Sequence, residues 1–66
     1  MLDQQFGEFD TIRYKGGIGV VLDVIEDSGA YFYNIRMYDP YNNKFHFINE
    51  VPQHELKPVK STLAFQ

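Results

Sequence analysis

Short β-type segments separated by turn residues are the feature of this sequence that most restricts its fold. Apolar and polar residues alternate over 9–14, and the segments 18–25, 30–38 and 44–49 are rich in β-branched or aromatic residues. Glycine, proline, asparagine or serine separates each segment from the next, and these residues favour turns. A short closing strand over 56–59 brings the number of predicted strands to five. The pattern therefore predicts a small all-β domain.

The segments 30–38 and 44–49 are predicted to pair as a hairpin across a five-residue loop. Pairing Tyr38 with Lys44 divides the side chains between an apolar face and a mixed face. The apolar face comprises Met37, Ile35, Phe45 and Phe47. The mixed, outer face comprises Phe32, Asn34, Arg36, Tyr38, Lys44, His46, Ile48 and Glu50.

The remaining segments complete the predicted domain. Pro52 excludes an interior strand over 50–55, so a short 3-10 turn is expected before the closing strand. The residues expected to be buried are Ile12, Val21, Ile35, Phe47 and Leu56, with Tyr31, Tyr33 and Phe45 also assigned to the core. Residues 1–8 are predicted to form a flexible arm, 9–59 the folded domain and 60–66 a tail.

Length and charge exclude several classes of protein. Sixty-six residues allow one small core. The net charge is −3, and the six Lys and Arg residues are spread along the sequence, which disfavours nucleic-acid binding. No apolar run is long enough to span a membrane, and the first ten residues do not resemble a signal peptide. A cytoplasmic location is therefore predicted.

Catalytic and metal-binding motifs are missing from the sequence. There is no cysteine, so disulfides and thiolate zinc sites are excluded, and this composition suits a reducing compartment. The two serines, Ser28 and Ser61, lack a nucleophile motif. His46 and His54 match no metal-ligand spacing with the neighbouring glutamates. We expect a protein that is not an enzyme and that requires no metal or cofactor.

Two stretches of the sequence resemble parts of known families. KGGIGVVLDV at Lys15–Val24 resembles the glycine turn and valines of the KOW signature. VPQHELKPV at Val51–Val59 is similar to the ending of small SH3-like proteins, including short ones from Gram-positive phages and prophages. With the hairpin between them, the resemblance covers residues 9–59 and implies a five-stranded SH3-like barrel.

The predicted function is that of a protein-binding module, and the resemblance suggests an accessory or host-modulating protein of a phage or prophage. Exposed Tyr, Phe and Arg side chains have the composition of an interface. The candidate protein-binding residues are Phe32, Arg36, Tyr38, Tyr41 and His46. Three alternatives stay open: a KOW-type nucleic-acid- or nucleoprotein-associated domain, a homo-oligomeric structural protein, and an outer face covered by the N-terminal arm or the Leu63–Phe65 tail.

Overall fold

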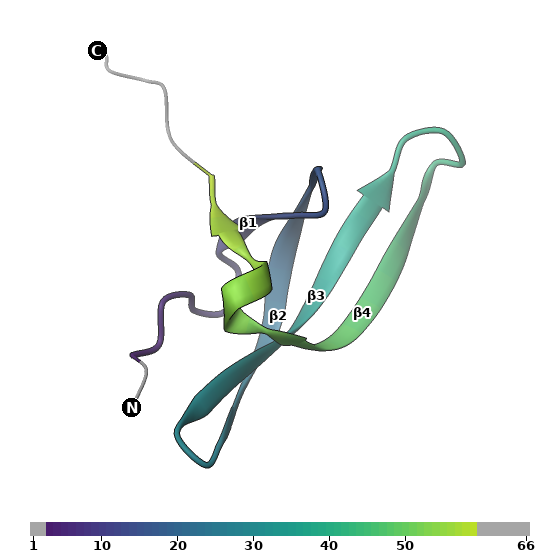
Figure 1. The fold of residues 1–66 in the computed structure, drawn as a ribbon. Coiled ribbons are helices and arrows are strands. Elements are labelled where there is room, and N and C mark those ends of the chain that lie inside the picture. The colour runs from purple at the N-terminus through teal and green to yellow at the C-terminus, as the bar shows by residue number, and fades with distance from the viewer. Residues whose placement is uncertain (1–2, 60–66) are drawn as a thin grey trace.

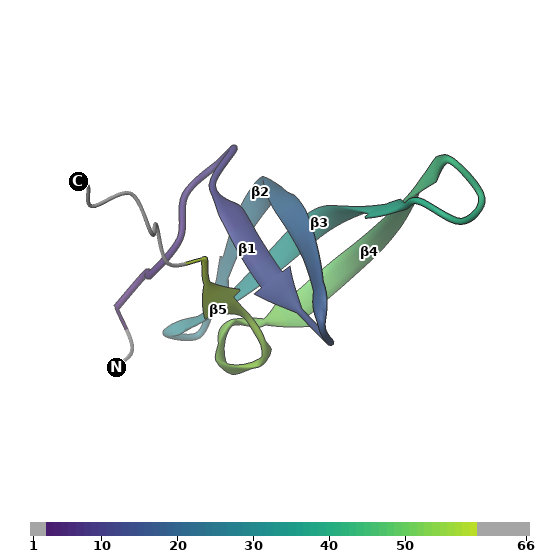
Figure 2. The ribbon, with the colours of Figure 1, turned by 90° about the horizontal axis from the view of Figure 1, so that it is seen from above.

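A computed structural model describes residues 3–59 of the chain as one five-stranded antiparallel sheet. Its elements are β1 (Thr11–Tyr14), β2 (Gly17–Asp27), β3 (Ala30–Asp39), β4 (Lys44–Pro52), the 3-10 turn η1 (Gln53–Glu55) and β5 (Lys57–Pro58). The strand order is β4-β3-β2-β1-β5, so β4 and β5 are the two edges. The β3–β4 hairpin projects away from β1 and β5 (Figures 1 and 2). The predicted all-β class, with a 3-10 turn before the last strand, is confirmed.

Two irregularities bend the long strands. The pairing of β2 with β3 shifts register after Val21, so that both Val21 and Val24 pack toward the core. The pairing of β3 with β4 shifts opposite Asn34. The Asn34 side chain accepts a hydrogen bond from the Glu50 N–H at 2.9 Å and donates one to the Asp23 carboxylate at 3.3 Å. A single side chain therefore binds the backbone at one irregularity and a side chain at the other.

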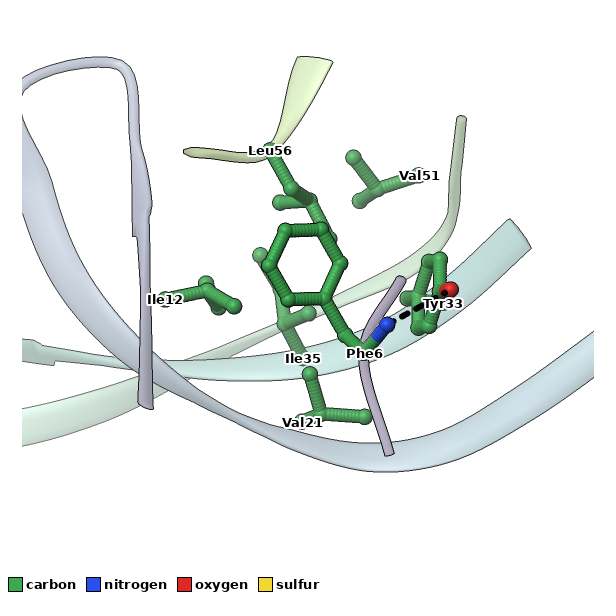
Figure 3. Packing of buried hydrophobic residues seen from close by; sticks show 7 residues of the cluster. All are labelled: Phe6, Ile12, Val21, Tyr33, Ile35, Val51 and Leu56. Carbon is green, nitrogen blue, oxygen red and sulfur yellow. Dashed lines mark hydrogen bonds between the residues drawn. The ribbon is translucent and has the colours of Figure 1, made fainter. Parts of the chain in front are cut away.

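The core lies on one face of the sheet, and the N-terminal segment covers it. The buried apolar residues are Phe6, Ile12, Val21, Tyr33, Ile35, Val51 and Leu56. Figure 3 shows the Phe6 ring in the middle of this cluster, and its centroid lies 5.7 Å from that of Tyr33 in an edge-on arrangement. The predicted burial of Ile12, Val21, Ile35, Leu56 and Tyr33 is confirmed, whereas Tyr31 is only partly buried against the cluster.

A buried polar network attaches the N-terminal segment to the sheet. The Oε1 atom of Gln53 accepts hydrogen bonds from the Tyr33 hydroxyl at 2.5 Å and the Gln5 N–H at 3.0 Å. The Nε2 atom of Gln53 donates to the Asp3 carbonyl at 2.8 Å. The Tyr33 hydroxyl also accepts a hydrogen bond from the Phe6 N–H at 3.4 Å (Figure 3). These bonds give hydrogen-bond partners to the buried side-chain amide of Gln53. Without them, burying this polar group would cost free energy.

The predicted register of the β3–β4 hairpin was wrong by one residue. Strand β3 continues through Asp39, which pairs with Lys44, so Tyr38 pairs with Phe45. Because side chains alternate between the faces of a sheet, this shift moves Phe45 and Phe47 from the core face to the outer face. The two rings are 48% and 66% exposed. Their predicted burial is therefore also wrong.

The turn before β1 contains a large residue in a conformation that favours glycine. The Asp10 N–H donates to the Gly7 carbonyl at 3.1 Å, and Phe9, at the third position of this turn, has a φ of 70°. Its side chain is 76% exposed, so little packing offsets the conformational cost. We expect Phe9→Gly to raise the free energy of unfolding by about 1 kcal/mol, measured by urea denaturation.

The matched control for this prediction is Phe9→Ala. Alanine removes the ring but keeps the Cβ atom that disfavours a positive φ. We therefore expect Phe9→Ala to unfold near the wild-type midpoint. Equal stabilisation by both substitutions would mean that the exposed ring, and not the backbone, is the source of the effect.

Candidate interaction face

The side of the sheet opposite the core carries a line of residues that crosses four strands. Thr11 pairs with Val20, Val20 with Arg36 and Arg36 with Phe47. Directly paired residues present their side chains on the same face. Tyr38 and Phe45 form the neighbouring pair on β3 and β4, and Ile18 lies two residues before Val20 on β2. We call the resulting surface the outer aromatic patch, and it comprises Ile18, Arg36, Tyr38, Phe45 and Phe47.

The side chains of the outer aromatic patch contact one another. The ring centroids of Tyr38 and Phe45 lie 5.3 Å apart, with their planes tilted by 54°. The guanidinium carbon of Arg36 lies 4.4 Å from the centroid of Phe45, within the range of a cation–π interaction. The Tyr38 hydroxyl donates a hydrogen bond to Oδ1 of Asn43 at 2.7 Å. These contacts restrict the side chains before any partner binds.

The loop beside the patch is organised by one carboxylate. Asp39 accepts hydrogen bonds from the Tyr41 N–H at 3.0 Å and from the side chain of Asn42 at 2.7 Å, and the His46 ring nitrogen lies 3.3 Å from it. The hydrogen bond from Asn42, followed by that involving His46, holds the pKa of the Asp39 carboxyl below its ordinary value. The carboxylate therefore stays ionised at neutral pH and accepts these hydrogen bonds from the loop.

The structure brings together two of the five predicted site residues and separates the others. Arg36 and Tyr38 are neighbours in the patch, and Tyr41 is almost fully exposed in the adjoining loop. His46 was predicted opposite Arg36 but pairs with Met37, so it lies on the other face. Phe32 is on the outer face as predicted, but it lies near the start of β3, away from Arg36 and Tyr38.

Phe32 contributes to a separate small pocket at the other end of the outer face. The pocket is lined by Ile25, Asp27, Phe32 and Glu50. Its volume of about 240 Å³ is below the range of about 300–1,000 Å³ typical of small-molecule sites. We therefore assign no small-molecule site to it.

Sequence reasoning did not place Ile18, Phe45 and Phe47 in the site. A β3–β4 loop one residue shorter than the predicted one shifts the pairing by one position. With that pairing, the alternation of side chains places Phe45 and Phe47 on the outer face. Ile18 follows the glycine turn, and its position on the outer face depends on the register of β2 with β1 and β3.

The described part of the N-terminal segment, residues 3–8, is held on the core side of the sheet and not on the outer face. Phe6 packs into the core cluster, and Gln53 binds the backbone of Asp3 and Gln5, so this segment lies against the core side. The Leu63–Phe65 tail, which was the other predicted cover, lies outside the described residues.

The described residues carry no metal-binding cluster and no membrane-spanning helix. Within residues 3–59, no group of three or more His, Cys, Asp or Glu side chains is arranged to hold a metal ion. Across the same residues, no helix has the length and apolar character needed to cross a membrane.

Comparisons with family models, curated proteins and solved structures gave no match.

Proposed function

We propose that this chain is a non-enzymatic protein-binding module that uses the outer aromatic patch to bind its partner. The observation that carries the proposal is the clustering of exposed Ile18, Tyr38, Phe45 and Phe47 around Arg36 on one sheet face. Aromatic residues and arginine are enriched in interface cores because each buries a large area at modest entropic cost. Placement on paired strands also reduces the ordering cost of binding.

The proposal includes an SH3-like barrel as the finer description of the fold. The strand order, with β5 beside β1, and the 3-10 turn before β5 support this assignment. The resemblance of Lys15–Val24 and Val51–Val59 to KOW and small SH3-like sequences supports it further. On the same resemblance we propose a cytoplasmic accessory or host-modulating role in a phage or prophage.

Phe47→Ser is the substitution that tests this function most directly. The ring is two-thirds exposed, so we expect the unfolding midpoint to stay close to the wild-type value. Loss of an anchoring ring should weaken partner binding by about 2 kcal/mol, or roughly 30-fold. The measurement is capture of the partner from a host lysate, followed by titration of the captured protein.

The control is Phe9→Ser, which removes another exposed phenylalanine outside the patch. It should retain full capture. The proposal would be refuted if Phe47→Ser captured the same partner as the wild type with unchanged affinity, or if both serine variants lost it equally.

A further inference from the structure

We infer that the outer aromatic patch binds an acidic segment of its partner, with Arg36 receiving a carboxylate. This inference rests on the proposed protein-binding function. It is drawn from the positions of the charged side chains on the outer face. The net charge of −3 does not show that acidic and basic side chains lie at different ends of this face.

Basic side chains on the outer face gather at the end that holds the patch. Arg36 is in line with Phe47, and Arg13 pairs with Ile18. Lys57 on β5 pairs with Arg13, so it extends the row that contains Arg13 and Ile18. Neighbouring strands are about 4.8 Å apart, so the path over the sheet surface from β1 to β4 is about 14 Å. About four or five extended residues span that distance, which makes a short segment sufficient.

Acidic side chains on the outer face gather at the opposite end. Asp23 pairs with Asn34, beyond the register shift in β2. Asp27 and Glu50 line the small pocket at the end of β2 and the start of β3. The boundary between the two ends lies close to the bend in β2. An acidic ligand is therefore attracted to the patch and repelled from the rest of the same face.

Arg36 has the environment of a carboxylate-binding anchor. Its guanidinium group lies over the Phe45 ring and the residue as a whole is partly buried, so part of its conformational freedom is already restricted. Within residues 3–59, the close contacts between a basic side chain and a carboxylate are His46 with Asp39 and His54 with Glu55, and Arg36 takes part in neither. Stacking on a ring leaves the guanidinium N–H groups able to bind a carboxylate in a bidentate manner. Surrounding aromatic side chains exclude water from such a pair once the partner binds.

The charge pattern favours an acidic polypeptide segment over a nucleic acid. Among residues 3–59, three cations on the paired strands, Arg13, Arg36 and Lys57, lie on this face, whereas a protein that binds nucleic acid through its phosphates can make about 6–10 such contacts. A continuous polyanion that crossed the sheet along β2 or β3 would also meet Asp23, Asp27 and Glu50. A short acidic segment can end before that region.

The test uses fluorescence polarisation with a short labelled peptide of alternating Glu and Leu. Arg36→Gln should weaken its binding about tenfold or more, and Arg36→Lys should recover part of the loss because it keeps the charge without the planar fork. Lys44→Gln is the matched control, because it removes one charge from the residue that pairs with Asp39 on the other face. It should leave the affinity within about twofold of wild type.

Several results would overturn the inference. Equal binding of a peptide of alternating Gln and Leu would show that charge is irrelevant, and equal losses for Arg36→Gln and Lys44→Gln would remove the special role of Arg36. Tighter binding of an oligothymidylate than of the Glu–Leu peptide would assign the face to nucleic acid. A concentration-dependent dimer that Phe47→Ser abolishes would assign it to a second copy of this chain.

The experiment also separates this inference from the function on which it depends. If Phe47→Ser loses its partner while Arg36→Gln keeps it, the patch binds protein but the partner's acidity is refuted. If Phe47→Ser keeps its partner, the proposed function itself fails.

Discussion

Replacing Phe6 by alanine should lower the free energy of unfolding by about 3–4 kcal/mol. The ring is buried among residues from β1, β2, β3 and β4 and against Leu56, which joins η1 to β5, so its removal leaves a cavity bordered by most of the core (Figure 3). Domains of this length have total stabilities of about 3–10 kcal/mol. We therefore expect a large fall in the midpoint of chemical denaturation, and a partly unfolded protein at the lower end of that range.

Two controls make this prediction specific to burial. Phe6→Leu keeps most of the apolar volume and should cost less than Phe6→Ala. Phe47→Ala removes the same side chain from an exposed position and should change the midpoint only slightly. If Phe6→Ala unfolded within about 1 kcal/mol of the wild type, the N-terminal segment would not be part of the core.

Gln53→Leu should have the next largest effect, lowering the free energy of unfolding by about 2–3 kcal/mol. Leucine is similar in size but cannot accept the hydrogen bonds from the Tyr33 hydroxyl and the Gln5 N–H, nor donate to the Asp3 carbonyl. Buried polar groups that lose their partners cost about 1–3 kcal/mol each, although those near the surface can recover water. The change is measured by urea denaturation.

A double-mutant cycle with Tyr33→Phe tests the origin of this loss. In the double variant the Tyr33 hydroxyl is gone, so Gln53→Leu no longer leaves that group without an acceptor. Replacement of both partners by apolar groups can be nearly neutral, so the double variant should be more stable than the sum of the single effects predicts. Strict additivity would mean that the two side chains do not depend on each other.

Local sequence patterns were sufficient to predict the elements of the fold but not the register of its most aromatic hairpin. Five strands and the 3-10 turn follow from alternation and turn residues, which act over a few neighbouring positions. Loop length depends on whether β3 ends at Tyr38 or Asp39, and both choices give an alternating pattern. Asp39 is the last residue of β3, and its carboxylate accepts a hydrogen bond from the loop backbone. This contact favours the longer strand and the shorter loop.

The same shift of one residue explains which parts of the candidate site were predicted. Arg36 and Tyr38 belong to the outer face in either register, since they alternate with the core residue Ile35 on their own strand. Phe45 and His46 exchange faces when β4 moves by one position.

Phe6 could not be assigned to the core from the sequence, because its neighbours show no periodicity. Its burial depends on Tyr33 and Gln53, which are distant in the sequence and come close only after folding. Propensity and alternation report on adjacent residues, so contacts of this kind are outside their reach.

The adjacency of the first and last strands has a consequence for how the protein is made. β1 pairs with β5, and the side chain of Gln53 holds the backbone of Asp3 and Gln5. A nascent chain can form the β2–β3 hairpin early, since hairpins need only local contacts. It cannot cover Phe6 or complete its core until Leu56 and Pro58 have left the ribosome. We therefore expect this domain to acquire its stable structure after residue 58 has emerged, in a single late step that joins both ends of the sheet.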